Sequence, residues 1–72
     1  FLGRAAAAEA QGRLRDAVTA YQEAIGMFPD FGVAHWRLAG TLEKLGRLRE
    51  SARERALAVR LGVGSGDPKA GL

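Results

Sequence analysis

The sequence contains no cysteine, so neither a disulfide bond nor a thiolate metal site can hold the chain together. Proline occurs only twice, and no apolar run approaches the ~18 residues that a membrane-spanning helix needs. The N-terminus has no secretory type of apolar run. These absences predict a soluble chain without a membrane segment, and we take a cytoplasmic location as the default expectation.

Residues that carry chemistry are also scarce. The 72 residues include one histidine, two serines and three aspartates. This set cannot supply a metal site of ordinary ligand count or a nucleophile with its base and orienting group. The composition therefore argues against an enzyme and gives no reason to expect a cofactor.

A repeat is the strongest feature that is present. The tetrapeptide Gly12-Arg13-Leu14-Arg15 recurs thirty-four positions later as Gly46-Arg47-Leu48-Arg49. In the same register Ala5 matches Ala39, Glu9 matches Glu43, and Ala24 matches Ala58. Such a period is the length of one helix–turn–helix unit, and units of this kind stack on one another to bury their apolar faces.

Helix-breaking residues divide the chain into four expected helices. Glycine takes a left-handed conformation without a Cβ clash, so Gly12 and Gly46 are expected to end the first and third helices. Pro29 should end the second helix, and the Asp30 side chain can cap the third. The expected helices span about 2–11, 14–28, 31–45 and 48–61.

Apolar residues recur at helical spacing in the second and fourth helices. We expect a continuous buried stripe on the second helix and an interrupted stripe on the fourth, with Ala17, Ala24, Ala39 and Ala58 at close helix approaches. The second stripe contains Leu14, Ala17, Val18, Tyr21, Ala24, Ile25 and Phe28, and the fourth contains Leu48, Ala52, Val59 and Leu61. Arg55 interrupts the fourth stripe where the first copy has Tyr21, and its charged head favours contact with water. We therefore expect the last helix to end the array.

The two ends of the sequence carry their own expectations. Four glycine or proline breakers fall within residues 62–68, which indicates a flexible tail. The sequence starts with Phe1-Leu2 in mid-pattern, as expected of a piece of a longer protein. We divide the chain into a first repeat at 1–29, a second repeat at 30–61 and a tail at 62–72.

The repeated residues resemble the tetratricopeptide repeat, with its pattern W-x2-L-G-x2-Y, then A-x3-F, then P. The second copy reads His35-x2-Leu38-Ala39-x2-Leu42, and the first copy contains Ala17-x3-Tyr21 followed by Pro29. The resemblance implies an all-α fold of two stacked antiparallel helix–turn–helix hairpins, a fragment of an α-solenoid. Three positions depart from the pattern: His35 stands for Trp, Arg55 for an aromatic residue and Val63 for Pro. A packing role is therefore expected for His35.

In the resembled family, the first helix of each hairpin lines a concave groove that binds a peptide or protein segment. Transferred to this chain, that groove comprises Leu2, Gly3, Ala6, Glu9 and Ala10 with Val33, Trp36, Arg37, Gly40, Glu43 and Lys44. Tryptophan and arginine are enriched at binding hot spots, so Trp36 beside the small Ala6 and Gly40 is the expected anchor. The alternative is that Trp36 packs between the hairpins. The resemblance implies a scaffold or adaptor role and leaves the partner unidentified.

Two other functions remain open. The net charge is +3, and Arg49, Arg53 and Arg60 share one side of the last helix, as in a surface for nucleic acid or another polyanion. Glu50 and Glu54 interleave with them and no aromatic residue lies among them, so we favour a protein partner over nucleic acid. Two hairpins are also a small core, which makes self-association through the N-terminal helix, or a spacer role, a further alternative.

Overall fold

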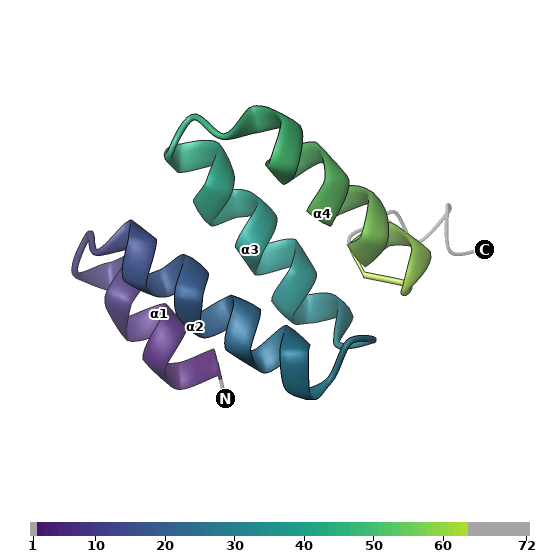
Figure 1. The fold of residues 1–72 in the computed structure, drawn as a ribbon, viewed down its shortest axis with the longest axis horizontal. Coiled ribbons are helices and arrows are strands. Elements are labelled where there is room, and N and C mark those ends of the chain that lie inside the picture. The colour runs from purple at the N-terminus through teal and green to yellow at the C-terminus, as the bar shows by residue number, and fades with distance from the viewer. Residues whose placement is uncertain (1, 64–72) are drawn as a thin grey trace.

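Four helices form two antiparallel hairpins in the computed structural model, which describes residues 2–63 (Figure 1). They are α1 (Leu2–Ala10), α2 (Leu14–Met27), α3 (Gly32–Lys44) and α4 (Leu48–Arg60). Every bound lies within one residue of the expected one, and residues 2–63 contain no strand, so the all-α prediction is confirmed. Of the flexible tail expected at 62–72, Gly62 and Val63 are described, and the Val63 N–H donates to the Ala58 carbonyl at 2.9 Å; the remainder falls outside the described residues.

Glycine ends three of the four helices in the same way. Gly12, Gly46 and Gly62 have φ values of 76°, 79° and 92°, which a residue with a Cβ rarely adopts. After each glycine the next N–H bonds back to a carbonyl in the last turn of the helix; the Arg13 nitrogen, for example, lies 2.8 Å from the Ala8 oxygen. This Schellman pattern satisfies helix-end carbonyls and reverses the chain.

The connection from α2 to α3 departs from the expectation. Asp30 does not cap α3, because Phe31 occupies the N-cap position and makes no side-chain cap hydrogen bond. The Phe31 N–H instead donates to the Phe28 carbonyl at 2.9 Å. This turn leads directly from α2 into α3, and α3 packs against both α2 and α4.

Small residues dominate the core and let the helices approach closely. Ala17, Ala24, Ala39 and Ala58 are all buried, as predicted. The cluster that joins the first hairpin to α3 consists of Ala5, Ala8, Ala17, Val18, Ala20, Tyr21, Leu38 and Leu42. In the second hairpin the buried Ser51 hydroxyl donates to the Ala39 carbonyl at 2.8 Å, which ties α4 to α3.

The interrupted apolar stripe of α4 faces solvent. Leu48, Ala52, Val59 and Leu61 are exposed, and α4 turns Ser51 towards α3. Periodicity identifies residues that share a helix face, but it does not identify the face that a neighbour covers. Phe28, expected at the end of the buried stripe of α2, is likewise 44% exposed.

Candidate functional site

Eight of the eleven residues expected on the groove form the candidate binding site, and they lie on two helices. Ala6 and Glu9 belong to α1, and the other six, Val33, Trp36, Arg37, Gly40, Glu43 and Lys44, belong to α3. We call this set the α1–α3 face. Leu2, also expected on the groove, packs instead against the core cluster.

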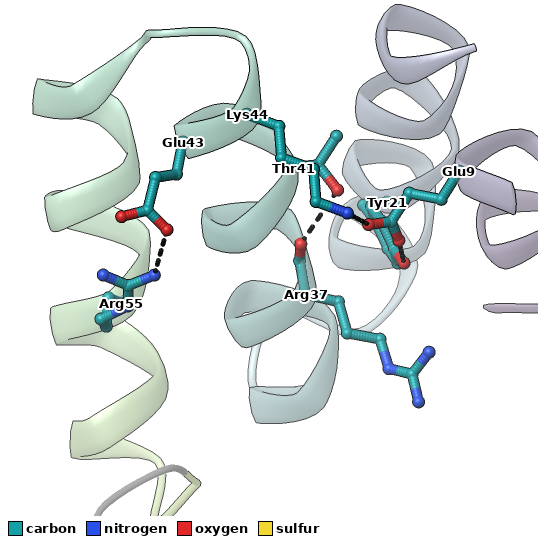
Figure 2. Close-up of polar contacts among 7 residues, drawn as sticks. All are labelled: Glu9, Tyr21, Arg37, Thr41, Glu43, Lys44 and Arg55. Carbon is teal, nitrogen blue, oxygen red and sulfur yellow. Dashed lines mark hydrogen bonds and ion pairs between the residues drawn. The ribbon is translucent and has the colours of Figure 1, made fainter. Parts of the chain in front are cut away.

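Glu9 is the point at which the first three helices meet (Figure 2). The Tyr21 hydroxyl of α2 donates to Glu9 Oε1 at 2.6 Å. From α3, Lys44 Nζ approaches Glu9 Oε2 at 3.5 Å. A half-buried carboxylate of α1 is thereby held by one side chain from each of the next two helices.

The pKa values of Glu9 and Tyr21 show which protonation state each side chain has at neutral pH. Burial and the hydrogen bond to Glu9 raise the pKa of Tyr21 to about 12. Burial also tends to raise the pKa of Glu9, but the Tyr21 hydrogen bond and the nearby Lys44 outweigh it, so the pKa lies below the ordinary value. At neutral pH a neutral phenol therefore donates to an ionised carboxylate. The hydrogen bond of this pair joins α2 to α1.

The second hairpin repeats this arrangement with a different pair. Glu43 and Arg55 stand thirty-four positions after Glu9 and Tyr21, and Arg55 Nη2 lies 3.3 Å from Glu43 Oε1. The guanidinium also lies over the Trp36 ring, 5.3 Å from its centroid, within range of a cation–π interaction. Arg55 Nε is buried and has no hydrogen-bond partner among the described residues.

Trp36 is thus part of the contact between α3 and α4. Trp36 is half-buried, and the Arg55 guanidinium stacks on its ring. The packing interpretation and the binding interpretation of Trp36 are therefore compatible, because part of the residue remains accessible.

Arg37 differs from the other charged residues of the face. Glu9, Lys44 and Glu43 each form an ion pair, whereas no carboxylate of the described residues pairs with Arg37. Its backbone carbonyl accepts a hydrogen bond from the buried Thr41 hydroxyl at 3.1 Å. Its exposed side chain lies near the Tyr21 hydroxyl and lowers the pKa of Tyr21, although burial and Glu9 outweigh this effect. The face therefore presents one uncompensated positive charge.

His35 of α3 is 5% exposed, so the expected packing role is consistent with its position. Its Nδ1 lies 2.6 Å from Glu54 Oε1 of α4, and its Nε2 lies 2.8 Å from the Pro29 carbonyl oxygen. Both partners are acceptors, so both ring nitrogens donate only when the imidazole is protonated. Burial lowers the pKa of His35, but the hydrogen bonds to Glu54 and Pro29 outweigh burial and raise it.

Metal and membrane sites find no support in the described residues 2–63. They contain no group of three or more histidine, cysteine or acidic side chains placed to hold a metal ion. No helix in this part of the chain combines the length and apolar character needed to cross a bilayer.

The family follows from the match to a tetratricopeptide repeat model, which covers residues 3–60. The chain belongs to the tetratricopeptide repeat family. Modules of this family generally mediate protein–protein interactions and are typically non-enzymatic. Comparisons with curated proteins and with solved structures yield no significant match.

Sequence reasoning missed three members of the polar network, namely Tyr21, Thr41 and Arg55. The repeat register held a usable signal for two of them. Glu9 and Glu43 are identical at equivalent positions, and Tyr21 and Arg55 are equivalent as well. Two equivalent pairs in which a carboxylate can accept from its partner indicate a recurring contact. Thr41 carries no such signal.

Proposed function

We propose that this repeat module binds a protein or peptide segment across the α1–α3 face and serves as a scaffold or adaptor. The observation that carries the proposal is the pairing of charges on that face. Glu9 is neutralised by Lys44 and Glu43 by Arg55, which leaves Arg37 as the free charge next in sequence to the partly accessible Trp36. Charged and aromatic groups of this kind dominate interface energetics.

The same pairing indicates the chemistry of the bound segment. A segment with an apolar or aromatic side chain can pack on the accessible part of Trp36, and a carboxylate near it can pair with Arg37. The small Ala6 and Gly40 allow a backbone to come close to the helices. An extended or helical peptide with an apolar anchor and a nearby acidic residue fits these requirements.

The experiment begins with peptides of about twelve residues selected from a random library on the whole chain. Calorimetry then compares the wild type with Trp36→Ala and Arg37→Ala. We expect Trp36→Ala to weaken binding by at least ~30-fold, as for a hot-spot residue. The double charge reversal Arg49→Glu, Arg53→Glu on α4 serves as the control and should leave the affinity nearly unchanged.

The outcomes separate this proposal from polyanion binding. If Trp36→Ala binds the selected peptides as tightly as the wild type, the α1–α3 face is not the binding surface. If the arginine reversals abolish binding, and binding collapses between low and moderate salt, the chain is a polyanion-binding module. Counterion release produces that steep dependence.

A further inference from the structure

The outer side of α4 carries a second feature that the α1–α3 face does not explain. Its exposed residues form an apolar strip next to a basic strip. The apolar strip contains Leu48, Ala52, Ala56 and Val59, and the basic strip contains Arg49, Arg53 and Arg60. Leu48, at 63% exposed, is the most exposed of the large apolar residues described. We call these seven residues the α4 surface.

We propose that the α4 surface binds an amphipathic α-helix of a partner protein, with the apolar side of that helix on the apolar strip and its carboxylates facing the three arginines.

The first hairpin supports a helix as the occupant. The residues of α2 equivalent to Leu48, Ala52 and Val59 are Leu14, Val18 and Ile25. Val18 is buried and Ile25 packs on the core cluster, which contains Leu38 and Leu42 of α3, the helix that packs on α2. The same positions on α4 have the same spacing and no helix over them within residues 2–63. The surface is therefore shaped for a helix, because the repeat already uses its counterpart in that way.

The course of the chain after α4 differs from its course after α2. Phe28 and Pro29 lead directly into α3, which covers α2. After α4, Gly62 adopts φ 92° and reverses the chain. Val63 then lies against the start of α3, so close that a Cβ added to Gly32 would meet Val63 Cγ2 at 2.6 Å. The residues that follow α4 directly therefore turn towards α3 rather than across the α4 surface.

Charge indicates which kind of helix fits. The second hairpin, residues 32–63, contains seven basic and three acidic side chains. All three carboxylates are already engaged: Glu43 with Arg55, Glu50 with Arg47 and Glu54 with His35. Arg49, Arg53 and Arg60 form no ion pair among the described residues. A partner's carboxylates can pair with these arginines, and such pairing favours a helix with an acidic flank.

A second copy of the chain fits less well. The helix of a second copy equivalent in position to α3 would be α1, and its exposed side carries Arg4. The only acidic residue of α1, Glu9, is already held by Tyr21 and Lys44. Arg4 itself pairs with Glu23 of α2 at 3.9 Å, so α1 offers no free carboxylate to the basic strip. Nucleic acid is disfavoured by the adjoining apolar strip and by the absence of an aromatic residue on α4.

The test uses a synthetic helical peptide of about 18 residues with leucines along one side and glutamates along one flank of that side. A scrambled peptide of the same composition and a single-stranded DNA of about 20 thymidines serve as the other probes. Fluorescence anisotropy is measured with the wild type and with Arg49→Glu, Arg53→Glu. The matched control is Arg4→Glu, Arg15→Glu, which changes the net charge equally, and Arg15 is the repeat equivalent of Arg49.

We expect the α4 reversal to weaken binding of the amphipathic peptide by about tenfold or more, and the matched control by less than about threefold. Scrambling the peptide should weaken binding about as much as the α4 reversal does. The double variant Leu48→Ser, Val59→Ser should also weaken binding to that extent, and it leaves the net charge unchanged. Equal binding of the scrambled peptide, or tighter binding of the DNA to the same arginines, overturns the proposal in favour of a polyanion surface. A dimer in sedimentation that dissociates on α4 reversal overturns it in favour of a second copy.

Discussion

The two hairpins place equivalent residues in different surroundings. In the first, Tyr21 is fully buried and its hydroxyl bonds to Glu9, which also faces Lys44 from the following helix. In the second, Arg55 occupies the position of Tyr21 and supplies the positive charge for Glu43 from within the same hairpin. The first hairpin, whose α2 is covered by α3, has a tyrosine at this repeat position. The second hairpin, whose α4 has no helix over its outer side within residues 2–63, has an arginine there.

This difference shows that the repeat position determines the direction of a side chain, whereas the neighbouring helix determines its burial. The position sets the direction of the side chain, since both pairs meet in the same way. The neighbour sets the burial, and burial decides whether a charge is tolerated. Arg55 retains access to water on its open side and stacks on Trp36, whereas an arginine at position 21 would lie in the core.

The largest expected effect comes from truncating the two equivalent residues. Tyr21→Ala removes a fully buried aromatic side chain and leaves Glu9 without its donor, so we expect a loss of about 3–5 kcal/mol in the free energy of unfolding. Arg55→Ala removes a partly exposed ion pair and should cost less than about 1 kcal/mol. Urea unfolding followed by circular dichroism measures both. Similar losses for the two variants would contradict the contrast between the hairpins.

The next effect tests how tightly the covered hairpin is packed. Ala24 is buried on α2, and replacing it by leucine should overpack the helices and cost about 1–3 kcal/mol. Ala52→Leu on the exposed side of α4 is the control and should change the stability little. The two melting temperatures make the comparison, and an unchanged melting temperature for Ala24→Leu would refute close packing at that position.

The sequence predicted the fold more fully than the candidate site, and particular residues show why. Helix ends follow from local chemistry, so Gly12, Gly46 and Pro29 located them within one residue. The small buried residues followed from the repeat register. The exposure of the α4 stripe did not, because it depends on which side of the helix has a neighbour. The contact between Trp36 and Arg55 joins two helices, and single-helix patterns do not reveal it.

A pH dependence should distinguish the hairpins in the neutral range. The pKa of His35 is raised in the folded state, so its contribution to stability is fully present below the unfolded value of about 6.5 and is lost as the pH rises through the folded pKa. The pKa of Glu9 is lowered and that of Tyr21 is raised to about 12, so neither titrates near neutrality. We expect the urea midpoint to fall as the pH rises from about 6 to about 9.

Two variants assign this pH dependence to the second hairpin. His35→Gln should lose it between those pH values, and Glu54→Gln should reduce it, because Glu54 is the acceptor that favours the charged imidazole. Tyr21→Phe in the first hairpin should retain it. A slope that survives in His35→Gln would show that another group is responsible.

The smallest effects concern two glycines of α3, the helix that packs on both α2 and α4. A Cβ at Gly40 would meet no atom within 4 Å, so Gly40→Ala should raise the free energy of unfolding by about 0.5–1 kcal/mol through helix propensity and a less flexible unfolded chain.

A Cβ at Gly32 would lie 2.6 Å from Val63 Cγ2 and 3.1 Å from Leu61 Cβ. The valine methyl can move, but the leucine Cβ is fixed to the backbone. Gly32→Ala should therefore lower stability by about 1 kcal/mol. Adding Val63→Ala should recover part of that loss, and a double-mutant cycle by urea unfolding measures the coupling. Strict additivity of the two changes would mean that Val63 does not close over the start of α3, and the α4 surface would then lose one of the observations that separates it from the covered side of α2.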